Sequence, residues 1–183
     1  MDESGLVKIK KRIGAILENE LENENIYVDR HVPLNISEGT IFNVRFESLQ
    51  KSNHTQHGAN IEADFTIDVW CSSKNSNGNR GDTDSALKRD ELITKVDEIL
   101  SRNEYVTLGF DAGLIMSSNI DNIQTFESGN EKDANYVTMA RANLNVRYYE
   151  DYKVFDGVAF NEGFANVKLG LTDRGYKFKT ELQ

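Results

Sequence analysis

Two long runs in which apolar and polar residues alternate limit the folds open to this chain. The first covers residues 61 to 72 and the second covers residues 136 to 148. A period of two is typical of a β-strand that buries one face and leaves the other polar. Twelve residues of strand span about 40 Å, roughly twice the common strand length. The chain is therefore predicted to contain a sheet with two unusually long strands.

The polar faces of these two strands carry opposite charge. Asp64 and Asp68 lie on the polar face of the first strand, and Arg141 and Arg147 on that of the second. Opposite charges on adjacent strands stabilise each other across a sheet. If the two strands are neighbours, we expect Asp64 or Asp68 to pair with Arg141 or Arg147.

Two other segments have the periodicity of amphipathic helices. Apolar residues recur at i, i+3 and i+4 over residues 5 to 23, and Ser4 is a suitable N-cap. A second helix is predicted over residues 84 to 101, with Asp82 or Asp84 as its cap.

Shorter strand patterns complete the predicted domain. They lie at residues 26 to 28, at 42 to 46 and, with imperfect alternation, at 120 to 126. This order predicts an α+β fold: a mostly antiparallel sheet with long strands, and two main helices packed on one face. We place this domain at residues 1–150.

The segment 151–183 has a different character. Four glycines interrupt its short apolar pieces, which predicts short strands or an extended C-terminal arm instead of a helix. A neighbouring molecule could accept such an arm along one of the long strand edges.

The first predicted helix is basic at its start and acidic at its end. Lys8 points away from the apolar stripe, whereas Lys10 falls inside it, and four glutamates follow from residue 18 to 24. This distribution opposes the helix macrodipole. Either the charges form a solvated face, or the basic end meets an acidic partner.

Composition and motifs argue against a catalytic site, a metal site and a cofactor site. The only cysteine, Cys71, lies on the apolar phase of its strand, where a buried thiol is unreactive. His54 and His57 are spaced as a weak metal motif with no further ligand nearby, and His31 stands alone. No nucleophile elbow, phosphate loop or dinucleotide motif occurs. We expect no enzyme activity, no metal and no cofactor.

The net charge also excludes broad classes of partner. Thirty acidic residues against 21 basic ones give −9, which disfavours bulk attraction to nucleic acid or anionic lipid. No signal-peptide pattern or membrane-spanning run is present, so a cytosol-like environment is expected.

The order of elements between residues 5 and 150 resembles the tail terminator and tail completion proteins of tailed bacteriophages. The run from Ala63 to Trp70, the helix at 84–101 and the closing strand from Ala140 to Tyr149 carry the resemblance. The segment 151–183 and the long connection at 103–119 depart from the family's compact form.

The resemblance implies a structural virion protein, assembled in the host cytoplasm as a ring at the head–tail junction or the top of the tail tube. The ring would be a hexamer or a dodecamer that contacts tail tube and neck or connector proteins, while DNA passes through its lumen without specific binding. The expected subunit or lumen surface contains Lys8, Lys10, Asp64, Asp68, Arg141 and Arg147. The alternative is a soluble acidic binding module that acts on a host factor.

Overall fold

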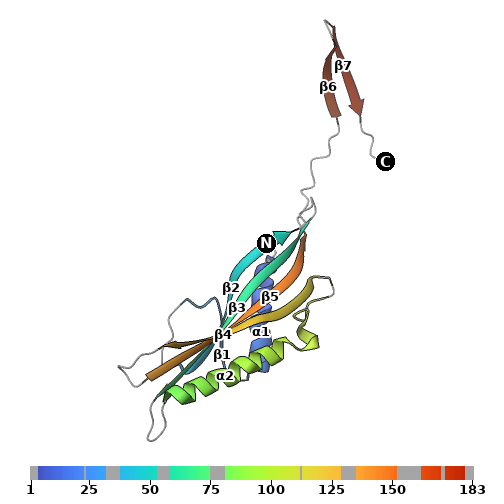
Figure 1. Cartoon of the computed structure of the whole chain (residues 1–183). Helices are drawn as coiled ribbons and strands as arrows, with labels where there is room; N and C mark the ends of the chain where they lie inside the picture. Colours follow the sequence, from blue (N-terminus) through green and yellow to red (C-terminus); the bar gives the residue numbers. More distant parts are fainter. Residues whose placement is uncertain are drawn as a thin grey trace. The chain divides into compact units, whose positions relative to one another are not determined.

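The chain divides into two compact units, Met1–Asp151 and Tyr152–Gln183, which are described separately (Figure 1). The computed structural model describes residues 4–22, 24–31, 38–52, 58–74, 81–111, 113–128, 135–151, 162–169 and 172–179. The first unit holds a five-stranded sheet and two helices, and the second holds a two-stranded hairpin.

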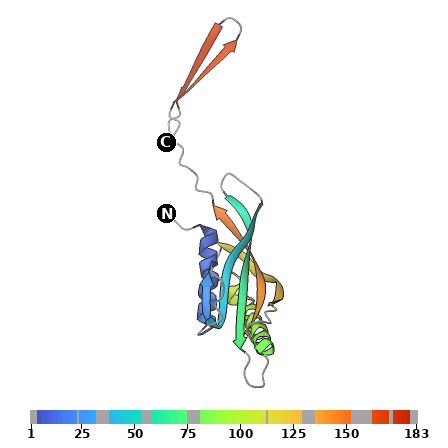
Figure 2. The same cartoon turned by 90° about the vertical axis from the view of Figure 1, so that its left-hand side faces the viewer.

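The sheet has the strand order β1-β2-β3-β5-β4. β1 pairs with β2 in parallel, and every other pairing in this sheet is antiparallel. The strands twist along their length (Figures 1 and 2), as expected for L-amino acids. Their bounds are Asn25–Val28 for β1, Thr40–Ser52 for β2, Gly58–Lys74 for β3, Ile115–Ser128 for β4 and Asn135–Asp151 for β5.

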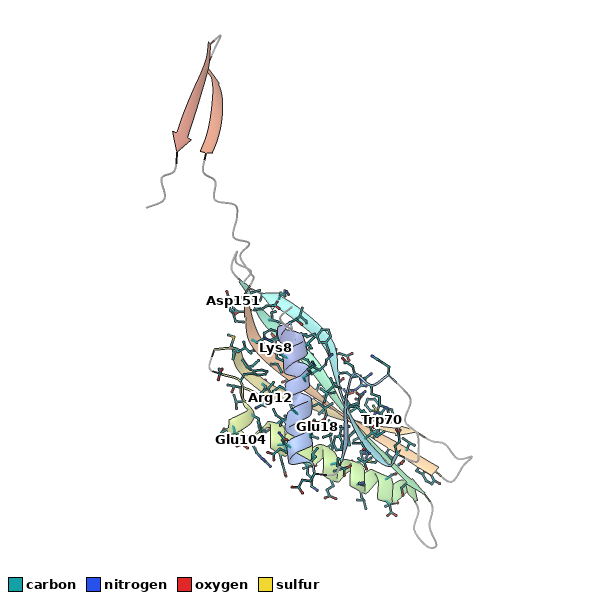
Figure 3. The ribbon with its side chains drawn as sticks, turned by 180° about the vertical axis from the view of Figure 1, so that it is seen from behind. Lys8, Arg12, Glu18, Trp70, Glu104 and Asp151 are labelled. Atoms are coloured by element: carbon teal, nitrogen blue, oxygen red, sulfur yellow. The ribbon has the colours of Figure 1, made fainter. Side chains whose placement is uncertain are left out.

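Helices α1 (Gly5–Glu20) and α2 (Gly81–Leu100) cover one face of the sheet and leave the other without a helix. Helix α1 contacts β1 and β2, and α2 contacts β3 and β5. Figure 3 shows α1 lying along the strands, with Lys8, Arg12 and Glu18 marking its course. The buried face of β3 contributes alternate residues to one core with both helices: Ile61, Ala63, Phe65, Ile67, Val69 and Cys71. The predicted α+β fold is therefore confirmed.

Several predicted boundaries were wrong in detail. Strands β3 and β5 each run for 17 residues, so they exceed the alternating segments at both ends. Helix α2 begins at Gly81, which puts Asp82 and Asp84 in its first turn and not at the cap. Ser4 does occupy the N-cap of α1, but its side chain makes no capping hydrogen bond.

Register shifts, or β-bulges, interrupt two strands. One falls between Phe46 and Ser48 in β2, and two fall in β4, between Ile115 and Ser117 and between Ile120 and Asn122. A bulge adds one residue to a strand and re-aims the side chains around it. Glu47 and Asp121 are inserted at two of these shifts, and both lie on the face without helices.

The second unit contains strands β6 (Glu162–Leu169) and β7 (Thr172–Lys179), paired antiparallel. Both strands lie in the segment 151–183, for which short strands or an extended arm were predicted. An isolated two-stranded hairpin is only marginally stable in water, because it buries little apolar surface.

Candidate assembly surfaces

The face of the sheet without helices, called here the open face, is centred on Asp68. Its carboxylate is buried, with 1% of the side chain exposed, between two arginines from the neighbouring strands. Arg141 Nε donates to it from β5 at 2.6 Å, and Arg45 Nη2 donates to it from β2 at 2.5 Å. Hydrogen bonding to Asp68 raises the pKa of Arg141. The predicted pairing of Asp68 with Arg141 is present, and the three residues form the Asp68 triad.

The other predicted acid and base on this face are not paired with each other. Asp64 accepts hydrogen bonds from Ser48 at 2.6 Å and from the Asn145 side chain at 2.9 Å, both neutral groups. Arg147 pairs instead with Glu62 at 3.1 Å, because the β3–β5 register puts these two residues opposite one another. Among the residues that the structure describes, Asp64 therefore has no ion-pair partner.

A pocket of about 330 Å³ opens on the same face and spans strands β2 to β4. Its acidic side chains are Asp64 and the two bulge residues, Glu47 and Asp121. Glu47 and Asp121 were missed by the sequence reading. A signal existed, since the apolar spacing lengthens from two to three between Phe46 and Leu49, where β2 bulges. This open-face pocket is lined by Glu47, Asp64, Thr66, Asp121, Gln124, Arg141 and Asn143.

The two edges of the sheet carry exposed apolar side chains. Within the described part of the chain, β4 has no strand on its outer side, and its Met116, Ile123 and Phe126 are 56%, 38% and 41% exposed. At the opposite edge, Tyr27 and Val28 of β1 are also exposed. Long strand edges with exposed apolar residues are sites where another chain can pair.

The two lysines predicted on the first helix have different environments. Lys8 is exposed, whereas Lys10 is largely buried and pairs with Asp29, just after β1. Arg12 also turns inward, and its Nε donates to the Leu108 carbonyl at 2.9 Å. Of the basic groups at the start of α1, Lys10 and Arg12 therefore hold the subunit together.

The buried Cys71 has the environment expected of a core thiol. Burial raises its pKa to about 11, and burial likewise raises the pKa of Tyr148 to about 12. His54 and His57 lie outside the described residues, while His31 is exposed. In the described ranges, no cluster of ligating side chains could hold a metal ion, and no helix is long and apolar enough to cross a membrane.

Comparisons with known proteins give structural similarities only. No family model matches the chain, and no curated protein matches it. Solved structures that resemble it include the sheath/tube terminator of an extracellular contractile injection system, at 10% identity and a TM-score of 0.42 over 94% of this chain and 67% of that one. Another is a chain of a native gene transfer agent virion, at 15% identity and a TM-score of 0.38 over 78% and 92%.

A third similar structure, of a protein without a descriptive name, has 13% identity and a TM-score of 0.46 over 82% of this chain and 99% of that one. With TM-scores below 0.5, these similarities assign no function, so the proposal below depends on the surfaces of this chain.

Proposed function

We propose that this chain is a structural protein that forms a closed ring at the head–tail junction or at the top of a tail tube, without catalysis. The observation that supports this role is the pair of unlike sheet edges. One edge is the 14-residue strand β4 with its exposed apolar side chains, and the other is formed by β1 and β2.

Two unlike edges favour a head-to-tail contact between copies. When one surface of a subunit binds a different surface of the next, the contact is heterologous, and it closes into a ring if the rotation allows. Strand pairing would satisfy the unpaired backbone groups of β4 and cover Ile123 and Phe126. A hexamer or a dodecamer is the proposed ring, located in the virion after assembly in the host cytoplasm.

The partners proposed for the ring are the tail tube and the neck or connector proteins. DNA would pass through the lumen without specific binding, because the first unit is strongly acidic. It holds 26 acidic and 16 basic residues, for a net charge of −10. Repulsion of phosphates would limit adhesion of the passing genome. Exposed Lys8 remains available for an acidic partner, unlike Lys10.

The test is the assembly state of the purified full chain, measured by light scattering and negative-stain microscopy. We expect rings, formed alone or on isolated tail tubes. Phe126→Lys on the β4 edge should abolish them. Leu87→Lys is the matched control, because Leu87 is 65% exposed and belongs to helix α2 instead of an edge strand. A chain that stays monomeric and never joins tubes or necks refutes the proposal.

The acidic charge favours one other function. A compact acidic unit can imitate nucleic acid, so a soluble module that binds a host factor is the second candidate. Recovery of a single nucleic-acid-binding enzyme by the full chain, with no virion component, would support this alternative instead.

A further inference from the structure

The open-face pocket concentrates negative charge that the described residues around it do not fully neutralise. Two β-bulges each add an acid to it, Glu47 from β2 and Asp121 from β4. Asp64 is the third acid, and the two side chains that donate hydrogen bonds to it, Ser48 and Asn145, are neutral. The Asp68 triad beside it contributes one carboxylate and two guanidiniums, or +1. Together these groups leave a net charge of −2 around the pocket.

One polar atom in the pocket lining has no partner. Thr66 is 3% exposed, and its hydroxyl makes no hydrogen bond. A buried hydroxyl without a partner costs about 1–3 kcal/mol. The amide side chains of Gln124 and Asn143 line the same pocket and supply further acceptor oxygens. The pocket therefore offers oxygen acceptors and negative charge to a ligand with several N–H donors.

A side-chain ammonium or guanidinium matches this set better than a metal ion. In the described ranges, no group of three acids or other ligating residues is placed to hold a metal. Lysine presents three N–H donors and arginine five, on side chains long enough to reach into a pocket from a neighbouring surface. The ligand class is thus a basic peptide segment.

The chain itself contains such a segment in its second unit. Residues 152–183 have five basic and four acidic residues, for a net charge of +1 against −10 in residues 1–151. Strand β7 alone contains Arg174, Lys177 and Lys179 against Asp173. As a two-stranded hairpin, β6–β7 also needs a further surface for stability.

We propose that the open-face pocket of one copy binds the basic β7 strand of the hairpin from a second copy. This inference rests on the proposed ring, which brings copies together. The ten residues 152–161 that join the two units have a fully extended length of about 35 Å. Each subunit would then provide one pocket and one hairpin, so every contact in the ring would be strengthened in the same way.

The experiment mixes two full-length variants that each carry one new thiol, Asp121→Cys and Lys177→Cys. Cys71 is buried with a raised pKa, so it does not compete for a short bismaleimide under native conditions. We expect a cross-linked product that contains one molecule of each variant, identified by mass spectrometry. Only contact between copies can produce it.

The matched control replaces Asp121→Cys with Glu98→Cys, an exposed acid on α2 outside the pocket. We expect its cross-linking yield with Lys177→Cys to be at least about tenfold lower. Equal yields, or rings without a mixed product, would overturn this inference and leave the ring proposal standing. A double variant, Asp121→Cys/Lys177→Cys, tests the remaining case: cross-linking within this single chain, with no mixed product from the single variants, would assign the hairpin to its own sheet and overturn the inference too. A chain that stays monomeric, never joins tubes or necks and gives no mixed product would refute both proposals.

Charge reversal gives a second measurement that needs no new thiol. The double variant Lys177→Glu/Lys179→Glu should weaken self-association about tenfold or more, and the weakening should shrink in high salt. Adding Asp121→Lys should restore part of the affinity. An unchanged association constant in the double variant would contradict the proposed contact.

Discussion

Replacement of Asp68 by asparagine tests whether the open face is held together by charge. The Asp68 carboxylate is nearly fully buried and accepts three hydrogen bonds from arginine: two from Arg141, at 2.6 and 3.2 Å, and one from Arg45 at 2.5 Å. An asparagine side chain keeps one acceptor oxygen but turns an N–H₂ group toward N–H donors. At least one charge-assisted hydrogen bond is lost, and one guanidinium faces a donor.

The expected loss of stability follows from these contacts. A hydrogen bond to a charged group contributes about 1.5–3 kcal/mol, and removal of one partner of a buried ion pair costs about 3–5 kcal/mol. The two arginines are 34% and 26% exposed, so water recovers part of the loss. We therefore expect Asp68→Asn to lower the free energy of unfolding by about 2–4 kcal/mol. That is a large part of the about 5–15 kcal/mol that a domain has.

The assay is urea unfolding followed by the fluorescence of Trp70, the only tryptophan in the chain. For an m-value of about 2 kcal/mol/M, the midpoint should fall by about 1–2 M. Glu62→Gln is the matched control, because the Glu62–Arg147 pair is 44% and 60% exposed and should contribute at most about 1 kcal/mol.

Two results would refute this reasoning. One is a midpoint shift for Asp68→Asn no larger than that for Glu62→Gln. The other concerns Arg141→Gln: combined with Asp68→Asn, it should cost less than the sum of the single variants, by about 1–3 kcal/mol. Full additivity would mean that the two side chains do not interact.

Three further outcomes are expected. Cys71 should resist thiol reagents at pH 8 until the chain unfolds, because the thiol is buried and its pKa is raised to about 11. Its contribution to the free energy of unfolding is complete below pH 9, and about 2–3 kcal/mol is lost as the pH rises to 11. This loss should be absent in Cys71→Ala. The pKa of Glu20 is lowered because Tyr105 and Arg102 donate hydrogen bonds to its carboxylate. Its contribution to the free energy of unfolding is therefore present above pH 4.5 and is lost as the pH falls through the lowered pKa. In Glu20→Gln, the free energy of unfolding should depend less on pH in this acid range. Deletion of residues 154–183 should leave a folded first unit, by circular dichroism, that assembles poorly; normal incorporation into particles would refute the role given to the hairpin.

The centre of the sheet could be predicted because local pattern and burial agree there. Residues 61 to 72 alternate strictly, and the same alternate residues form the core. The ends of β3 were not predicted, because Ser73 and Lys74 have no apolar pattern of their own. They continue the strand because Tyr136 and Asn135 of β5 lie opposite them. Pairing with a neighbouring strand extends a strand beyond the reach of its own periodicity.

The connections that lock α1 to the rest of the first unit could not be predicted. Lys10 pairs with Asp29 and Arg12 with the Leu108 carbonyl, and the second contact joins residues 96 apart in the chain. Leu108 lies in a turn-rich segment and has a positive φ of 52°, which no hydrophobic periodicity indicates. A sequence pattern identifies the face of a helix, but it does not indicate which distant carbonyl will meet an arginine on that face.

The distribution of charge over the open face could be predicted only in part from the sequence. Opposite charges on neighbouring strands neutralise each other where the register puts them together, as it does for Asp68 with Arg141. A neutralised pair of this kind does not contribute to the repulsion of DNA. The charge that remains is carried by residues at breaks in the register, Glu47 and Asp121, together with Asp64. An acid opposite a base stabilises the subunit, whereas Glu47 and Asp121 have no base directly opposite them in the register. The bulges therefore supply two of the three acids proposed to bind a neighbour, whereas the register pairs Asp68 with Arg141 within the subunit.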